Sequence, residues 1–294
     1  MIFKKPLRIN VGRKIQRRTP SAWAGEVSER TVEVLPLVSD ANRQGVPGWC
    51  TYSDDFADLP EVEFFCGGIN TKTVTAAAWW RQGNLLHFGF DLSPSEMNET
   101  GQAMLLNSIA YVSRFTEDQP IAVTPSVFAG PVPRLRNSLK RLLARDSVQL
   151  ESVEYMLAPS VITALREKGS AALREWLNQN GDFLYPETDG RLAVDSEAIS
   201  FHTPPAQAEF IEKAIGALRE SGSRAQTAAS LLRRYAPDGP SDGAAQAWEK
   251  WWTENGPYLF FSEAGGYRYY VDPLAKKRGV PTRELRGPAR SSVR

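Results

Sequence analysis

Cys66 is the first candidate in this chain for a catalytic nucleophile. It ends a short apolar run and precedes Gly67-Gly68, a turn that can present a nucleophilic thiol. A thiol attacks as the thiolate, which a helix N-terminus or a neighbouring cation stabilises. The residues after this turn predict another strand, not a helix. His87 lies inside an apolar run, as buried, hydrogen-bonded histidines do. A thiol hydrolase that uses Cys66 therefore stays open only if a base lies nearby.

Asp195 and Asp272 are candidate acid–base carboxylates because each ends the second strand of a unit that occurs twice. The unit aligns REWLNQNGDFLY (174–185) with EKWWTENGPYLF (249–260). Facing copies would bring two carboxylates together, as acid–base work requires. An Asp in this place more commonly caps the next helix, and we favour that interpretation.

The repeated unit predicts a helix, a short aromatic strand, a glycine turn and a second strand. We expect the helix to direct its Trp inward and to end at Asn-Gly through a left-handed cap. Repetition of this kind indicates a pseudo-symmetric domain. The matched pairs are Trp176 with Trp251, Asn180 with Asn255, Gly181 with Gly256, Leu184 with Leu259, and Asp195 with Asp272.

Aromatic residues are dense in the second copy. They are numerous enough to form a stacking platform for a sugar or a peptide. Alternatively they are the core of a small α+β unit, and their presence in a repeat favours that structural role. The candidates are Trp248, Trp251, Trp252, Tyr258, Tyr267, Tyr269 and Tyr270.

No metal, cofactor or disulfide framework is predicted. Asp54, Asp55 and Asp58 together could hold a hard cation, but the central glycine and terminal Glu of a calcium loop are missing, which favours a solvated loop. Two cysteines and two histidines at distant positions do not indicate a zinc site.

The elements around Cys66 and His87 are the best specified in the chain. Strands are predicted at 62–66, 74–80 and 85–90, with a turn at 81–84 that makes the last two a hairpin. The runs alternate little, which is typical of strands buried on both faces of a layered α/β domain. A capping box, Ser93-Pro94-Ser95-Glu96, predicts the start of a helix. The apolar face of that helix is expected to comprise Met97, Gly101, Met104, Leu105, Ile109 and Val112.

Residues 61–115 resemble the C-terminal strand–hairpin–helix part of the class I glutamine amidotransferase-like fold, in its ThuA-like branch, and bacterial proteins that carry this block without a known activity. The resemblance implies preceding parallel strands, a cysteine at a strand-to-helix elbow and a His–Glu pair after a late strand. At the place of that pair the chain has Phe90-Asp91, so Asp91 joins Cys66 and His87 as a weak catalytic candidate. The residues that carry the resemblance are 78–80, 82–84, 86–89 and 105–109.

The composition limits the classes of function. The chain has 294 residues with 42% hydrophobic and 23% charged residues, enough for two domains. A net charge of +1 makes nucleic acid an improbable partner, because backbone binding needs clustered positive charge. No apolar run reaches the roughly 18 residues of a membrane span. Without a signal-peptide pattern we expect a cytoplasmic protein, with export as the alternative if the start lies upstream.

Two domains are expected. Residues 1–116 form an α/β domain, in which basic residues 1–20 are either an arm for nucleic acid or a strand. Thr31–Val38 predicts another strand. Pro-rich residues 117–134 are a linker, and 135–275 form a mostly helical α+β domain with the repeat at about 170–200 and 244–275. A helix is expected at 137–144 and a disordered basic tail at 276–294.

Three functions follow from these observations. Without a nucleophile–base–acid set, the sequence favours a non-catalytic interaction or scaffold protein. The aromatic density and the ThuA-like resemblance support a module that binds or processes carbohydrate. A thiol hydrolase is the third alternative. The expected partner is accordingly a protein or a carbohydrate.

Overall fold

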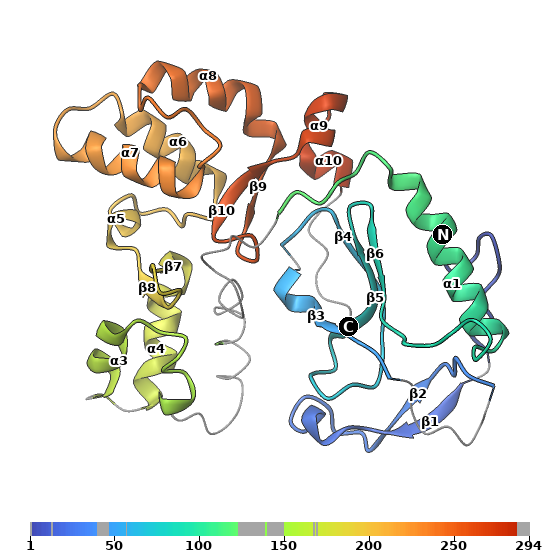
Figure 1. Ribbon diagram of the computed structural model, residues 1–294. Coiled ribbons are helices and arrows are strands. Elements are labelled where there is room, and N and C mark those ends of the chain that lie inside the picture. The colour runs from blue at the N-terminus through green and yellow to red at the C-terminus, as the bar shows by residue number, and fades with distance from the viewer. Residues whose placement is uncertain are drawn as a thin grey trace. The chain divides into compact units, whose positions relative to one another are not determined.

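The structure is a computed structural model, shown in Figure 1, and it describes residues 2–12, 14–39, 47–56, 58–122, 139, 150–166, 168 and 170–286. Contacts divide them into two units. Unit 1 comprises the described residues of Met1–Ala57 and Glu61–Pro120, and unit 2 those of Asp58–Pro60 and Ile121–Ala289. The predicted helix at 137–144, apart from residue 139, and most of the predicted linker lie outside the described residues.

Unit 1 is built around one central strand, β5 (Ala76–Gln82). β4 (Val62–Gly67) pairs with one edge of β5, while β3 (Thr51–Tyr52) and β6 (Leu85–Phe88) pair with successive parts of the other edge. The predicted hairpin is present, but its turn is shorter than expected. Arg81 and Gln82 continue β5 and pair with β6, so that a two-residue turn joins the strands.

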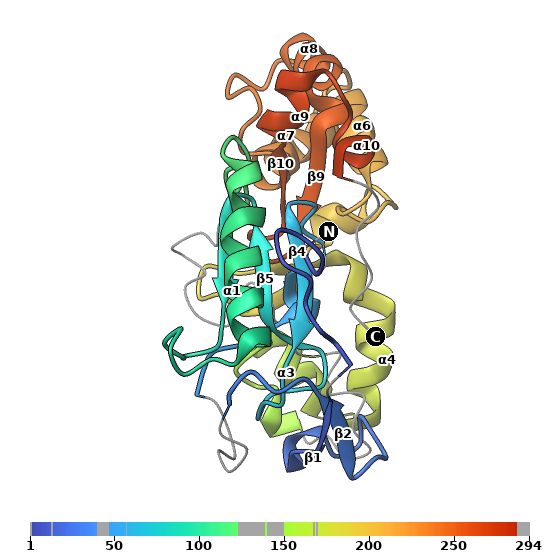
Figure 2. The same ribbon diagram turned by 90° about the vertical axis from the view of Figure 1, so that its right-hand side faces the viewer.

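Helix α1 (Glu99–Val112) covers one face of this sheet (Figures 1 and 2). Trp79 is fully buried there and packs with the helix residues Ala103 and Met104. On the opposite face Trp80 stacks on Phe56, with ring centroids 5.6 Å apart. Coverage of both faces explains why these strands alternate so little in sequence.

Every pairing between the labelled strands of the described residues is antiparallel. The prediction of a layered α/β domain is therefore wrong for the described part of unit 1, and the fold is mixed α+β. Apolar runs reveal burial on two faces but not strand direction. A two-residue turn can join only antiparallel neighbours, whereas parallel strands need a long crossover.

The predicted start of α1 at Ser93 is also wrong. The capping-box contact does form, since Ser93 N–H donates to Glu96 Oε2 at 2.9 Å, but it closes only a turn. The helix begins after Asn98, whose Oδ1 accepts from Gly101 N–H at 3.0 Å. Asn98 Nδ2 also donates to Pro36 O at 2.9 Å. A long-range anchor thus decides where the helix starts.

The buried face of α1 agrees only in part with the predicted one: Gly101 and Met104 are buried as expected. Asn107 is fully buried and holds the N-terminal segment, because its Oδ1 accepts from Leu7 N–H and its Nδ2 donates to Ile2 O. Ser108 is buried too, while Ile109, predicted to lie in the core, is 59% exposed. Polar side chains that bind the backbone thus displaced apolar ones from the buried face.

The N-terminal region contains a separate hairpin. β1 (Ile15–Arg18) pairs antiparallel with β2 (Thr31–Val34), with Ile15 opposite Val34. A strand within residues 1–20 was one of the two interpretations of that basic segment. The strand predicted over 31–38 ends at Val34, two residues before Pro36, which cannot donate to a ladder.

Unit 2 is mostly helical with two short hairpins. Helices α6, α7 and α8 enclose one hydrophobic core, and α3, α4 and the first hairpin contribute to a second. Its helices and strands are α3 (Pro159–Arg166), α4 (Ser170–Asn180), β7 (Leu184–Pro186), β8 (Leu192–Val194), α5 (Ser196–Ile199), α6 (Ala208–Ala217), α7 (Ser223–Tyr235), α8 (Ala245–Asn255), β9 (Leu259–Ser262), β10 (Arg268–Val271), α9 (Pro273–Arg278) and α10 (Thr282–Arg286). Short 3-10 helices lie at Ser21–Trp23, Ser53–Phe56 and Ser113–Phe115 in unit 1, and at Leu150–Ser152, Gly181–Phe183 and Gly256–Tyr258 in unit 2.

The two segments related by the sequence repeat have the same succession of elements: helix, 3-10 turn, hairpin, helix. The predicted left-handed Asn-Gly cap is wrong, since Gly256 has φ −48° and the chain continues into a 3-10 turn. Instead Asn180 Nδ2 donates to Trp176 O, and Asn255 Nδ2 to Trp251 O, both at 2.9 Å. The asparagine amide itself satisfies a terminal helix carbonyl.

The basic tail predicted to be disordered contains ordered helices up to residue 286. α9 ends at Gly279, which adopts the left-handed conformation (φ 63°). Thr282 at the start of α10 donates its hydroxyl to Tyr258 O at 2.9 Å. The low apolar content of this segment could not predict that a hydrogen bond holds it. Residues 287–294 lie outside the described part.

Candidate functional site

Cys66 and His87 flank β5 on its two opposite edges. Cys66 lies opposite Trp79, and His87 lies opposite Trp80. Because successive residues of a strand point to opposite faces of the sheet, the thiol and the imidazole face different sides. His87 stays with Trp80, at 5.8 Å between ring centroids, and does not act as a base for Cys66.

The surroundings of the other candidate groups also disfavour nucleophilic catalysis. Burial raises the pKa of the Cys66 thiol to about 12, so the thiolate is scarce near neutrality. Asp91 lies in an exposed segment after β6, where its backbone N–H donates to Pro47 O at 2.9 Å. The structure therefore gives Cys66 no activating partner among the residues that the sequence proposed.

Asp195 and Asp272 have the capping role that the sequence favoured. Asp195 Oδ1 accepts from Ala198 N–H at 3.1 Å, and Asp272 Oδ1 accepts from Ala275 N–H at 3.1 Å. A different arginine binds each carboxylate: Arg234 Nη1 lies 2.5 Å from Asp195 Oδ2, and Arg286 Nε lies 2.7 Å from Asp272 Oδ2. Tyr235 adds a hydroxyl donor to Asp195 at 2.9 Å. Sequence analysis missed these partners because they lie outside the aligned repeat.

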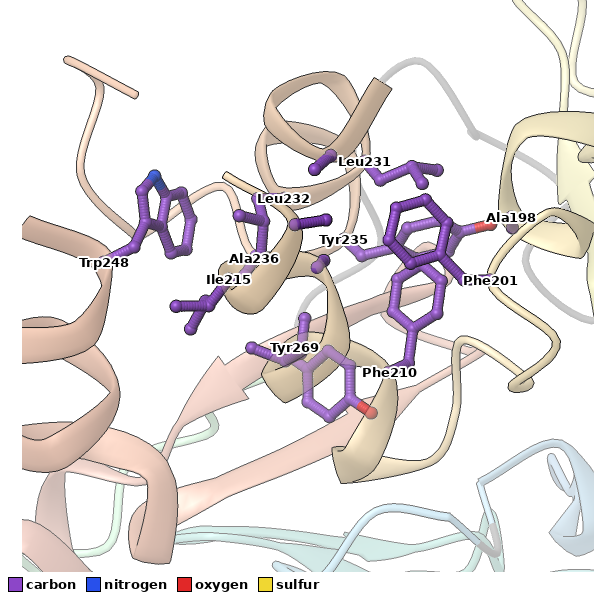
Figure 3. Close-up of a cluster of buried hydrophobic side chains, with 14 residues drawn as sticks. Ala198, Phe201, Phe210, Ile215, Leu231, Leu232, Tyr235, Ala236, Trp248 and Tyr269 are labelled. Carbon is purple, nitrogen blue, oxygen red and sulfur yellow. The ribbon is translucent and has the colours of Figure 1, made fainter. Parts of the chain in front are cut away.

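The aromatic candidates of the second copy mostly build the core. Trp248 and Tyr269 belong to the buried cluster in Figure 3, with exposed fractions of 1% and 4%. Tyr267 and Tyr270 are buried as well. Trp251, Trp252 and Tyr258 are half-buried, and Trp251 packs edge-on against Trp248 with ring centroids 5.4 Å apart. Four of these seven side chains are therefore buried, in agreement with the core role that the sequence favoured over a stacking platform.

Trp49 in unit 1 is the most exposed of the large hydrophobic side chains in the described part of the chain, with 77% of its surface exposed; Tyr155, in unit 2, is 58% exposed. The Trp49 backbone is nevertheless held at both ends: Trp49 N–H donates to Gly89 O at 2.8 Å, and His87 Nε2 lies 3.1 Å from Trp49 O. A tryptophan is usually well buried. An exposed indole on a fixed backbone is therefore a candidate binding group.

The backbone under Trp49 comes so close to the segment after β6 that two glycines are needed. A Cβ at Gly48 would lie 2.0 Å from Gly89 O, and one at Gly89 would lie 2.1 Å from Trp49 O. Lys72 fastens the next residue, since its Nζ donates to Cys50 O. These contacts fix the position of the Trp49 backbone before any ligand binds.

Sequence analysis did not single out Trp49. A lone aromatic in a loop-rich segment has no periodicity, and neither Gly48 nor Gly89 reveals by itself that the two backbones meet. The signal that could have found it is the large apolar side chain in a segment where turn residues and carboxylates otherwise dominate.

Comparison with known proteins adds no assignment to this site. No protein-family model, curated protein or solved structure matches the chain. Within the described residues there is no group of three or more His, Cys, Asp or Glu side chains that could hold a metal ion. Of the helices that the structure describes, none combines the length and the apolar composition needed to cross a membrane.

Proposed function

We propose that this protein is a non-catalytic interaction protein that binds a partner protein through Trp49. The observation that carries the proposal is the 77% exposure of an indole whose backbone is held by Gly89 and His87. The dispersed positions of Cys66 and His87 and the capping roles of Asp195 and Asp272 support a function without chemistry.

Physical reasons favour Trp49 as the binding residue. Tryptophan is enriched among the few residues that contribute most of the binding free energy at interfaces. Its two side-chain torsions give a large apolar contact area for little loss of conformational entropy. A backbone fixed in advance lowers the ordering cost further. A surface of this kind suits recognition of another protein.

Affinity capture from the source cell tests the proposal when wild type is compared with Trp49→Ala. The matched control is Leu85→Ala, which truncates another exposed apolar residue of unit 1, 63% exposed. We expect a partner that wild type and the control retain and that Trp49→Ala loses. Equal recovery of every captured protein by all three would overturn the proposal.

Carbohydrate binding is the second candidate, and the same exposed indole favours it, because sugar rings stack on aromatic faces. A glycan array probed with wild type and Trp49→Ala distinguishes the candidates. Glycan signals that disappear with Trp49→Ala would support carbohydrate, whereas an array without signals would exclude it for the glycans present.

A further inference from the structure

Residues 2–12, which we call the 2–12 segment, are held firmly on unit 1 although they form neither a helix nor a strand. Ile2 and Ile9 are buried in the core, with exposed fractions of 3% and 4%. Asn107 of α1 accepts from Leu7 N–H and donates to Ile2 O and Leu7 O. The backbone from which the outward side chains of the segment project is therefore fixed.

The outward side of the 2–12 segment is rich in large apolar side chains. Phe3, Leu7 and Val11 are 38%, 43% and 55% exposed. They are three of the nine large hydrophobic residues that are exposed in the described part of the chain. Single exposed apolar residues are normal on a protein surface, whereas their concentration in one place indicates an interaction site.

Three positive charges lie between these apolar residues. Lys4, Lys5 and Arg8 are all exposed. None of the ion pairs among the described residues involves them. The 2–12 segment has no acidic residue, so its three positive charges are uncompensated in a chain whose net charge is +1. Such a surface attracts anionic groups.

We propose that the 2–12 segment binds the surface of an anionic lipid bilayer. A bilayer of this kind offers both features that the segment matches, a dense layer of negative charge and hydrocarbon directly beneath it. The exposed apolar side chains enter the boundary between headgroups and acyl chains, as in other proteins that lie on a membrane. The three basic side chains contact the headgroup phosphates.

Two other classes of partner fit the 2–12 segment less well. Nucleic acid would use the positive charges, because phosphate contacts dominate its binding, but it would leave Leu7 and Val11 in water. Proteins commonly recognise a groove for a helix or the edge of a strand. The segment contains neither element, and a fluid bilayer requires neither.

The composition of the segment predicts weak, reversible binding that depends on charge. Each lysine or arginine close to an anionic bilayer strengthens binding about fivefold, so that three contribute about a hundredfold. Salt screens this contribution. Burial of the apolar side chains adds a second contribution, and lasting attachment to a membrane takes two such signals. The binding does not involve Trp49 and stands or falls independently of the proposed function.

Co-sedimentation of the full chain with lipid vesicles tests the proposal. One set of vesicles is pure phosphatidylcholine, and the other is a two-to-one mixture of phosphatidylcholine and phosphatidylglycerol. We expect wild type to bind the anionic vesicles at least tenfold more tightly than the neutral ones and to be released by high salt. Lys4→Gln/Lys5→Gln/Arg8→Gln should weaken binding to the anionic vesicles at least tenfold. Leu7→Ser/Val11→Ser should weaken it about tenfold without any change of charge.

Two control variants match these changes elsewhere in the chain. Ile69→Ser/Leu85→Ser removes two other exposed apolar side chains of unit 1, which are 41% and 63% exposed. Lys250→Gln/Arg278→Gln/Arg283→Gln removes three exposed positive charges of unit 2. Both should bind anionic vesicles as wild type does, and circular dichroism checks that every variant keeps its fold.

Several results would overturn the proposal. One is wild type that binds neither set of vesicles, or both sets equally. Another is a loss of binding in the unit 2 control as large as that of the 2–12 charge variant, because net charge alone would then explain the binding. A third is a Leu7→Ser/Val11→Ser protein that binds as wild type. Binding of labelled duplex DNA that only the 2–12 charge variant loses, without binding to vesicles, would assign the segment to nucleic acid instead.

Discussion

Arg286 and Asp272 form a buried ion pair with two contacts in unit 2. Nε of the arginine lies 2.7 Å from Oδ2, and Nη2 lies 3.1 Å from Oδ1. The side chains are 6% and 0% exposed. The same carboxylate caps α9, so one aspartate fastens α10 to the end of the second hairpin. This contact explains why the basic segment is ordered up to residue 286.

Replacement of Asp272 should strongly destabilise unit 2. Asp272→Ala leaves Arg286 buried without its carboxylate, which costs about 3–5 kcal/mol. The variant also removes the N-cap of α9, worth about 1 kcal/mol. Urea unfolding followed by circular dichroism measures the loss in free energy of unfolding.

Asp195→Ala is the matched comparison from the first copy. Its partner Arg234 is 27% exposed and keeps a second carboxylate, Glu197, at 2.7 Å. The charge left behind is therefore partly solvated and still paired, so the variant should lose less stability than Asp272→Ala. Because Asp195→Ala also removes the acceptor of the buried Tyr235 hydroxyl, the comparison is made in a Tyr235→Phe background, where an equal or larger loss at Asp195 would contradict the roles assigned to the two arginines.

Cys66 should be a slow thiol. Because burial raises its pKa to about 12, its thiolate fraction stays small up to pH 9. Alkylation by iodoacetamide of a Cys50→Ser protein, which retains only Cys66, should therefore be slower than that of free cysteine, whose pKa is near 8.5. Modification as fast as free cysteine at pH 7 would reopen the thiol-hydrolase alternative.

Asp58 should make the stability of unit 2 depend on pH. Burial and, next, the negative charge of Glu263 raise the pKa of the Asp58 carboxyl to about 7. An unfolded aspartate titrates near pH 4. The contribution of protonated Asp58 is thus complete below pH 4 and is lost as the pH rises through 7.

Asp58→Asn removes this titration but keeps an oxygen that can accept from Glu263 N–H, which donates to Asp58 Oδ2 at 2.6 Å. Relative to wild type, the variant should gain stability between pH 5 and pH 8 in urea unfolding. A stability difference between the two proteins that stays constant over this range would contradict the raised pKa of Asp58.

The sequence predicted local elements better than it predicted their assembly. Three hairpins were predictable, because apolar runs close together in sequence flank their turn residues: the hairpin of β5 and β6 and the two hairpins of the repeat. The start of α1 does not, because Asn98 is anchored to Pro36, 62 residues away. The prediction of strand direction also failed, because strands buried on two faces occur in parallel and antiparallel sheets alike.

The candidate site was harder to predict than the fold. The place of Asp195 and Asp272 at the ends of strands correctly suggested that they are caps, but neither arginine partner lies inside the repeat. Trp49 becomes a candidate only through its exposure and through the close approach of Gly48 and Gly89, which is a contact between distant segments. Ile109 shows the converse, because helical spacing alone assigned it to a core from which buried Asn107 and Ser108 exclude it.

The most direct test of a binding function without chemistry is the affinity of three proteins for the partner or glycan that wild type captures, measured by isothermal titration calorimetry. The proteins are wild type, Cys66→Ala/Asp91→Asn and Trp49→Ala. We predict equal affinity for the first two and a loss of at least about tenfold for Trp49→Ala, the size expected of a residue that contributes over 1.4 kcal/mol. Unchanged affinity for Trp49→Ala, or a loss confined to the double variant, would contradict the account.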